Sequence, residues 1–267
     1  MRGREARESN HLTLPLAMDT PDILGDEIVH PTKSIGEFLD FLTDSVPFGE
    51  VYLFGGVLRD LALLGRRGFN SDIDLVVEGH WSHCVAYLRS LGATQNKFGG
   101  FRLSVAGWPV DIWNAQETWA IRNGYVEYRG IASLTETTVL NWDAVLMDWR
   151  TKSFVSQPAY LEEIHDRILD VVLIPNPNPL GMAVRVFRHL CLKDARKITS
   201  RAAVYLADAT ESYTFDQIRN EEIRSYGAAV IQKPIYDLFH LVMLEEGVTI
   251  GERYGIATEA LRRELNL

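Results

Sequence analysis

Two aspartates, Asp72 and Asp74, flank Ile73 at the start of the apolar run that continues to Val77. Side chains alternate between the two faces of a β-strand, so both carboxylates of such a run project to the same side. Carboxylates held this close repel each other, and a hard divalent cation relieves the repulsion, because Mg²⁺ binds one or two carboxylates together with phosphate oxygens. The pair therefore predicts a metal site for phosphoryl transfer.

A glycine pair, Gly55-Gly56, precedes these aspartates and ends an earlier apolar run, Val51–Phe54. Because glycine has no side chain, backbone N–H groups there can approach a phosphate closely. The helical pattern that follows, which we expect to break at Gly65, would also present its positive N-terminal end to an anion. We expect this turn to hold the phosphates of a nucleotide next to the metal.

A third aspartate, Asp111, stands between Val110 and Ile112 in another strand-like run. Two interpretations are open at this position. Asp111 is either a solvent-facing residue of an edge strand, or a third carboxylate that completes a two-metal site and helps to activate an attacking hydroxyl.

The order of these residues resembles the head-domain signature of class II tRNA nucleotidyltransferases (CCA-adding enzymes) and bacterial poly(A) polymerases, which belong to the DNA polymerase beta nucleotidyltransferase superfamily. The resemblance rests on Gly55-Gly56, Arg59-Asp60, Leu63-Leu64-Gly65-Arg66 and Asp72-Ile73-Asp74. It implies an α/β (α+β) nucleotidyltransferase head with a mixed sheet, followed by an all-helical neck-like part. It further implies that Arg59 and Asp60 help to shape the nucleotide pocket, and that Asp72, Asp74 and Asp111 bind two Mg²⁺ ions.

Later segments match the family less closely. Arg185 and Arg188 resemble the pair of arginines in its first helix after the head, where they would meet triphosphate, RNA phosphate or nearby acids. The family carries an Arg-Asp pair shortly before an Asn-Ala, and this Arg-Asp pair is missing from Thr137–Ala144. This departure concerns the handling of the substrate more than the metal chemistry.

The sequence also predicts the helices and strands that would hold these residues. Apolar spacing predicts helices over residues 34–42 and 81–91, and alternation predicts a hairpin over 101–113 around Gly107. Residues 139–149 fit either a strand or a buried helix. Pro175, Pro177 and Pro179 predict a helix-breaking hinge, and helical patterns follow it over 180–193, 202–209, 215–228, 234–245 and 258–265. We therefore expect a flexible tail over 1–20, the head over 21–172 and the helical part over 173–267.

Composition narrows the class of protein. With 267 residues, of which 46% are hydrophobic and 10% aromatic, the chain can bury a full core. It has no apolar run of membrane-spanning length and no signal-peptide pattern, and its two cysteines, Cys84 and Cys191, are far apart, which favours reduced thiols and a cytoplasmic location. The net charge of −9 argues against a broad nucleic-acid-binding surface, although a small basic patch remains compatible with it.

The predicted reaction is Mg²⁺-dependent transfer of an NMP from an NTP, ATP or CTP, to an acceptor hydroxyl, with release of pyrophosphate. The first candidate acceptor is an RNA 3′ end, as in tRNA nucleotidyltransferases and poly(A) polymerases. The alternatives are a protein or small-molecule acceptor for the same chemistry, or a non-catalytic nucleotide-binding module. The sequence leaves the acceptor, the choice of NTP and the oligomeric state open.

Overall fold

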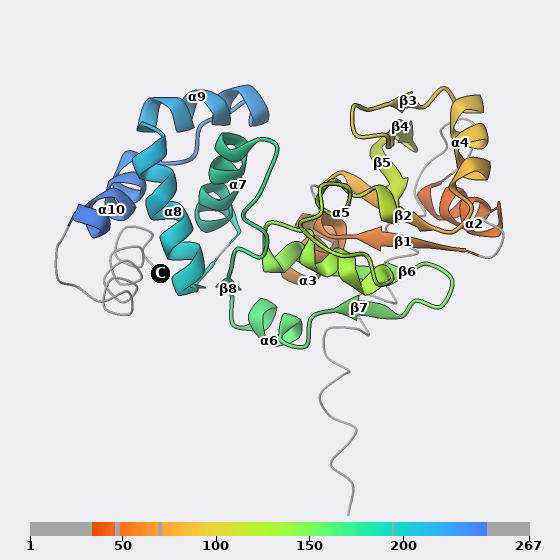
Figure 1. Cartoon of the computed structure of the whole chain (residues 1–267), viewed down its shortest axis with the longest axis horizontal. Coiled ribbons are helices and arrows are strands. Elements are labelled where there is room, and N and C mark those ends of the chain that lie inside the picture. The colour runs from red at the N-terminus through yellow and green to blue at the C-terminus, as the bar shows by residue number, and fades with distance from the viewer. Residues whose placement is uncertain (1–33, 46–48, 69–70, 194, 245–267) are drawn as a thin grey trace, which may run out of the picture. The chain divides into compact units, whose positions relative to one another are not determined.

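The protein is described by a computed structural model that covers residues 34–45, 49–68, 71–193 and 195–244 (Figure 1). Contacts divide this part of the chain into two compact units. The first runs to Thr138 and includes Trp142–Leu161, and the second contains Val139–Asn141 and the residues from Glu162 onward. The division at residue 172 inferred from the sequence stays a prediction. The proposed tail and the helical pattern over 258–265 lie outside the described residues.

A seven-stranded mixed sheet forms the centre of the first unit, in the order β3-β4-β5-β2-β1-β6-β7. The parallel pair is β2 with β5, and all other neighbours are antiparallel. The mixed sheet predicted from the sequence is therefore confirmed. Its strands are β1 (Glu50–Phe54), β2 (Ile73–Glu78), β3 (Thr94–Gln95), β4 (Phe101–Val105), β5 (Trp108–Asn114), β6 (Val145–Asp148) and β7 (Phe154–Ser156).

The two faces of this sheet are covered differently. On one face, Trp81 of α4 (Trp81–Ser90) packs against Phe101 of β4, and Phe41 of α2 (Ile35–Ser45) contacts Tyr87 of α4. The other face carries an apolar cluster under the short helix α5 (Trp119–Arg122) and the 3-10 helix Ile131–Glu136. That cluster contains Tyr52, Phe54, Val76, Ala115, Leu134 and Leu146.

Helix α3 (Gly56–Gly68) follows β1 directly and packs against β1, β2 and β6. Its regular path ends at Gly65, whose φ of +63° is a left-handed conformation that glycine adopts without strain. The break predicted at this glycine is confirmed. Residues 139–149, for which strand and helix were both open, contain a 3-10 turn, Asn141–Asp143, and then strand β6.

The second unit is mainly helical, with α7 (Pro179–Leu192) against α9 (Phe215–Tyr226) and α8 (Ser200–Ser212) against α10 (Lys233–Leu244). Helix α6 (Tyr160–His165) lies at the boundary between the units. Helix α7 begins after the proline-rich hinge, where the Asn178 side chain accepts a bond from the Gly181 N–H at 3.1 Å. A two-stranded parallel sheet, β8 (Ile168–Leu169) with β9 (Lys197–Ile198), adds to the helices. Helical periodicity cannot reveal strands this short.

Candidate active site

One row of paired residues crosses four adjacent strands of the sheet. Phe54 of β1 pairs with Asp74 of β2, and Asp74 pairs with Asp111 of β5. Asp111 in turn pairs with Arg102 of β4. Because directly paired residues project to the same face of a sheet, Asp74, Asp111 and Arg102 share the face that carries the Phe54 cluster. Strand β5 lies between β4 and β2, so the edge-strand interpretation of Asp111 is wrong.

Arg102 joins the aspartates of the two strands. Its guanidinium donates from Nε and Nη2 to the two Asp111 carboxylate oxygens at 3.0 and 2.7 Å, and from Nη2 to Asp72 Oδ2 at 2.5 Å. These hydrogen bonds, the Asp111 bond first, raise the pKa of Arg102. Half of the Arg102 side chain is exposed to solvent (55%), as is that of Asp72 (49%), whereas Asp111 is more enclosed (24%). A cation thus already lies between the carboxylates that were predicted to bind metal.

The donor set fits Mg²⁺ in its chemistry, since Asp72, Asp74 and Asp111 offer the hard oxygen ligands that this ion prefers. Their present arrangement is not a finished metal cage. In the described part of the chain, no group of three or more His, Cys, Asp or Glu side chains is placed so that it could hold a metal ion. The two carboxylates that Arg102 bridges would have to exchange this partner for the metal.

The glycine pair lies beside this row because β1 ends at Phe54, opposite Asp74. Gly55 has φ +63°, and a Cβ atom there would lie 3.3 Å from the Asp143 carbonyl oxygen. A Cβ atom on Gly56 would lie 3.3 Å from the Ser71 hydroxyl, so both positions favour glycine. The Gly55 N–H donates to the Val145 carbonyl at 2.9 Å. Any phosphate cradle therefore relies on Gly56 and the first turn of α3, where a helix has N–H groups with no intrahelical acceptor.

Arg59 and Asp60, which follow the glycine pair in the first turns of α3, form a buried network. Arg59 donates from Nε to Asp60 at 2.9 Å, from Nη2 to Ser71 at 3.2 Å, and from Nη1 to Asp143, and Ser71 donates to Asp60. Arg59 is 4% exposed and Asp60 is fully buried. Burial lowers the pKa of Arg59, but the charges of Asp143 and Asp60 outweigh it, so the pKa is raised overall.

This network connects three segments that border the carboxylate row: the start of α3, the approach to β2 at Ser71, and the 3-10 turn before β6. It fixes the glycine turn relative to the strand that carries Asp74. In this structure Arg59 and Asp60 therefore stabilise the segments around the site. Their direct contact with a nucleotide stays a prediction.

In the helical unit, Arg185 and Arg188 both lie on α7. Arg188 donates to Glu222 at 2.6 Å and to the Ala228 carbonyl at 3.3 Å, and its guanidinium stacks over the Tyr226 ring at 4.1 Å. Glu222 is fully buried and also accepts the N–H groups of Val230 and Ile231. Arg188 thus has a structural role within this unit, and phosphate binding by either arginine stays a prediction.

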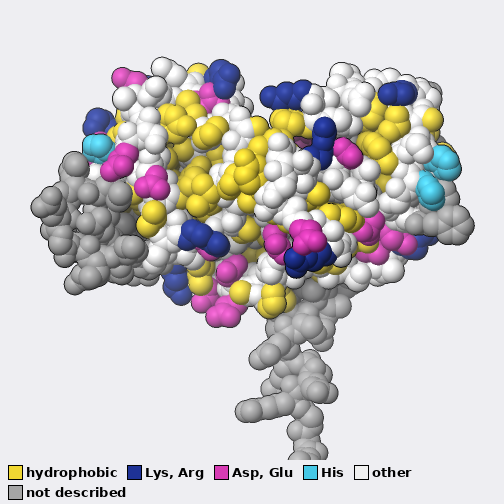
Figure 2. All heavy atoms as spheres, viewed as in Figure 1, with side chains coloured by type: hydrophobic (Ala, Val, Ile, Leu, Met, Phe, Trp, Pro, Cys, Tyr) yellow, Lys and Arg dark blue, Asp and Glu magenta, His cyan; other side chains and the backbone are white. Residues whose placement is uncertain are grey.

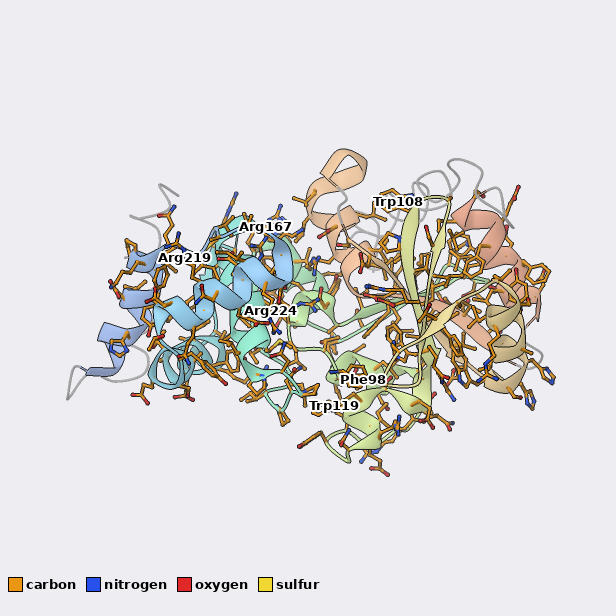
Figure 3. The ribbon with its side chains drawn as sticks, turned by 90° about the horizontal axis from the view of Figure 1, so that it is seen from above. Phe98, Trp108, Trp119, Arg167, Arg219 and Arg224 are labelled. Carbon is orange, nitrogen blue, oxygen red and sulfur yellow. The ribbon has the colours of Figure 1, made fainter. Side chains whose placement is uncertain are left out.

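An exposed aromatic surface borders the sheet near β4 and β5. Phe98 lies in the loop before β4 and is 38% exposed, with the Lys97 ammonium 4.9 Å from its ring centroid. Arg122 of α5 donates to the Phe98 carbonyl at 3.2 Å, which holds the loop near Trp119 on the same helix (Figure 3). Trp119 stacks on Tyr125, which is 52% exposed. Aromatic faces and cations therefore lie together beside the strands of the carboxylate row.

The sequence did not predict that Arg102 bridges Asp72 and Asp111. The signal was present, because a tight turn at Gly107 sets Arg102 opposite Asp111. Asp143 and Ser71 were missed as partners of Arg59. Nothing local marks Asp143, since it lies 84 positions away from Arg59 in the chain.

Comparison with solved structures places this fold beside CCA-adding enzymes. An apo CCA-adding enzyme matches with a TM-score of 0.55 at 17% identity, over 83% of this chain and 54% of the other. The Thermotoga maritima CCA-adding enzyme in complex with tRNA matches with a TM-score of 0.53 at 17% identity, over 92% and 69%. A CCA-adding enzyme in complex with CTP gives 0.52 at 17% identity with the same coverage.

These matches show a shared fold. No protein-family model matches the chain, and no curated protein does. The chain spans about half the length of the apo enzyme, at 54%. The described residues include no helix that is both long and apolar enough to cross a membrane.

Proposed function

We propose that this protein is a metal-dependent nucleotidyltransferase that transfers an NMP from an NTP to an acceptor hydroxyl. The acceptor oxygen would form a bond to the α-phosphorus, the bond to the β-phosphate would break, and pyrophosphate and the hydroxyl proton would leave. The observation that carries the proposal is the pairing of Asp74 with Asp111 across β2 and β5, with Asp72 joined to Asp111 through Arg102. The fold shared with CCA-adding enzymes supports it.

Each part of the site has a role in this proposal. Asp72, Asp74 and Asp111 would hold Mg²⁺, which when bound polarises the phosphoryl group and makes the acceptor hydroxyl a better nucleophile. Gly56 and the N-terminal turn of α3 would bind phosphate oxygens through backbone N–H groups. The buried Arg59 network would keep this turn and the carboxylate strand in fixed register, so that catalysis rests on positioning and on fixed charges.

An RNA 3′ end is the first candidate acceptor. One matching structure is a complex with tRNA and another a complex with CTP, which supports RNA and CTP, or ATP, as substrates here. Within this chain, Phe98 and Tyr125 offer exposed rings next to Lys97 and Arg122. Aromatic faces with nearby cations bind single-stranded nucleic acid by stacking and charge.

A protein or small-molecule acceptor is the second candidate, because the net charge of −9 and the Arg-Asp pair missing from Thr137–Ala144 favour a smaller or less anionic partner than a whole tRNA. A non-catalytic module is less favoured, since such a module would not need all three carboxylates.

One experiment distinguishes these alternatives. The protein is incubated with each α-labelled NTP, Mg²⁺ and total cell extract, and the label is followed into RNA, protein or small molecules. The control is the Asp74→Asn variant, which keeps the size of the side chain but removes its charge. Label that enters RNA with the wild type and not with the variant supports RNA transfer. Absence of any Asp74-dependent transfer contradicts an enzymatic function.

A further inference from the structure

Arg102 is the feature of this site that the proposed reaction does not explain. Its guanidinium makes contacts of 2.5 to 3.0 Å to Asp72 and Asp111, the carboxylates that would hold metal. The guanidinium therefore occupies carboxylate oxygens that a metal ion would need, and it supplies a positive charge from the protein itself. At the same time its side chain is 55% exposed, so solvent surrounds half of it.

We propose that Arg102 is the resident counter-ion of the carboxylate site, and that it couples the binding of metal to the binding of the NTP. It holds Asp72 and Asp111 in place while no metal is bound. It must release both before they can coordinate Mg²⁺, and it then contacts the triphosphate that arrives with the ion. This inference rests on the proposed function and makes Arg102 a residue that controls metal binding and then binds the nucleotide.

Electrostatics supplies the reason for the exchange. Asp74 of β2 pairs directly with Asp111 of β5, and Asp72 lies just before β2, so without Arg102 these carboxylates would repel one another with no guanidinium between Asp72 and Asp111. Arg102 holds both oxygens of Asp111 and one oxygen of Asp72, so a divalent ion that approaches these same oxygens meets a like charge at contact distance, which repels it strongly. The metal alone must therefore displace an existing ion pair.

The NTP changes this balance because it brings its own negative charge. An arginine side chain is long and flexible, and its planar fork binds phosphate oxygens as well as it binds carboxylates. A triphosphate beside the carboxylates gives the displaced guanidinium a new partner. Metal and nucleotide should therefore bind cooperatively in the wild type, and this cooperativity should depend on Arg102.

The test measures binding of Mn²⁺, as a probe for Mg²⁺, by the paramagnetic resonance signal of the free ion. Titrations use the wild type and Arg102→Gln, with and without a non-hydrolysable ATP or CTP analogue. We expect Arg102→Gln to bind Mn²⁺ about tenfold more tightly than the wild type without nucleotide, within the usual range of coupling between sites. The analogue should strengthen Mn²⁺ binding markedly in the wild type and much less in the variant.

Arg129→Gln is the matched control, because Arg129 is an exposed arginine that pairs with Glu127 at 2.5 Å in the same unit. Its Mn²⁺ affinity should equal that of the wild type. Arg102→Lys keeps the charge but not the fork, and should bind Mn²⁺ with an affinity between those of the wild type and Arg102→Gln. It also serves as the test variant if Arg102→Gln does not fold. Unchanged or weaker Mn²⁺ binding in the Arg102 variants would overturn the inference.

The variant with Asp72→Asn and Asp111→Asn separates this inference from the proposed function. If that variant binds Mn²⁺ and nucleotide as the wild type does, the metal site is assigned wrongly and the proposed function fails with it. If it loses Mn²⁺ binding while Arg102→Gln matches the wild type, the metal site stands and only the role of Arg102 is refuted.

Discussion

Asp111 has a partner on each side, Asp74 across the parallel pair and Arg102 across the hairpin. One neighbour repels it and the other attracts it. A cation beside Asp111 offsets the repulsion between the two carboxylates, whether this cation is the guanidinium or a metal ion. The residue is therefore suited to an exchange of cations and poorly suited to a purely structural role.

The exchange of Asp111 for asparagine tests its part in turnover. Asp72 and Asp74 remain to bind an NTP–Mg²⁺ complex, so we expect Asp111→Asn to leave NTP binding largely intact. Turnover should fall by orders of magnitude, because lost metal catalysis amounts to several kcal/mol. Equilibrium binding of a fluorescent nucleotide analogue and initial rates of pyrophosphate release measure the two quantities. Unchanged turnover would remove Asp111 from the catalytic set.

Arg59 is predicted to matter for stability first. Arg59→Met leaves Asp60 and Asp143 buried without their shared cation, and breaking a buried ion pair in this way costs about 3–5 kcal/mol. Urea denaturation followed by circular dichroism measures the loss. Arg129→Met is the control, since that exposed pair should add little to stability. If Arg59→Met were as stable as the control variant, the network would not hold the glycine turn in place.

Cys84 gives a prediction about pH. Burial raises the pKa of its thiol from about 9 to about 11. Its contribution to the free energy of unfolding is therefore complete below pH 9 and is lost as the pH rises toward 11, because the unfolded chain ionises first. Urea titrations of the wild type and Cys84→Ala should give stabilities that converge between pH 8 and about pH 10.5. A constant difference across this range would mean that the thiol ionises equally in both states.

At the scale of elements, local sequence patterns predicted individual helices and the hairpin of the first unit. The positions of the site residues relative to one another depend on pairing between strands that are distant in the chain. Apolar spacing identified α2 and α4, and alternation identified the hairpin of β4 and β5. The hairpin turns at Ala106 and Gly107, whose φ values of 51° and 79° match a tight two-residue turn. This turn sets Arg102 opposite Asp111, so the pair could be predicted once the turn was assigned.

Other contacts could not be predicted in this way. The pairing of Asp74 with Asp111 joins strands that are far apart in the chain, and its register depends on how the whole sheet packs. The contact between Arg59 and Asp143 is of the same kind. Strands β8 and β9 have two residues each, which is too short for any periodicity to appear.

The N-terminal cap of helix α9 allows the stability of a single element to be tested. Its N-terminus has a capping box, in which the Thr214 hydroxyl accepts the Gln217 N–H at 3.3 Å and the Gln217 side chain accepts the Thr214 N–H at 2.8 Å. Thr214→Ala should lower the free energy of unfolding by about 1 kcal/mol. Thr214→Ser keeps the hydroxyl and should stay close to the wild type in the same urea titration. Equal losses in the two variants would show that the methyl group matters and the cap does not.

At the scale of the whole molecule, the distribution of charge limits what the acceptor can be. The chain carries a net charge of −9. On the face seen in Figure 2, basic and acidic side chains are interspersed rather than gathered into a basic stripe. Several arginines already have acidic partners among the described residues, such as Arg188 with Glu222 and Arg224 with Glu221. A large polyanion would therefore meet few unneutralised cations on this part of the protein.

We therefore predict that RNA binds through a short 3′ end, with a shallow dependence on salt and weak affinity for isolated duplex. Each phosphate that a protein neutralises adds to the slope of log affinity against log salt concentration, so few contacts give a small slope. The candidate contacts are Arg59, Arg66, Arg67, Arg102, Arg185 and Arg188. Of these, the side chains of Arg66 and Arg67 lie outside the described residues, and Arg59 is buried. Filter-binding titrations of tRNA, of a short single-stranded oligonucleotide and of a duplex at several salt concentrations measure the slopes. A steep slope for tRNA, as expected when a protein neutralises about six or more phosphates, would contradict this charge argument. It would favour binding of the whole tRNA instead of its 3′ end alone.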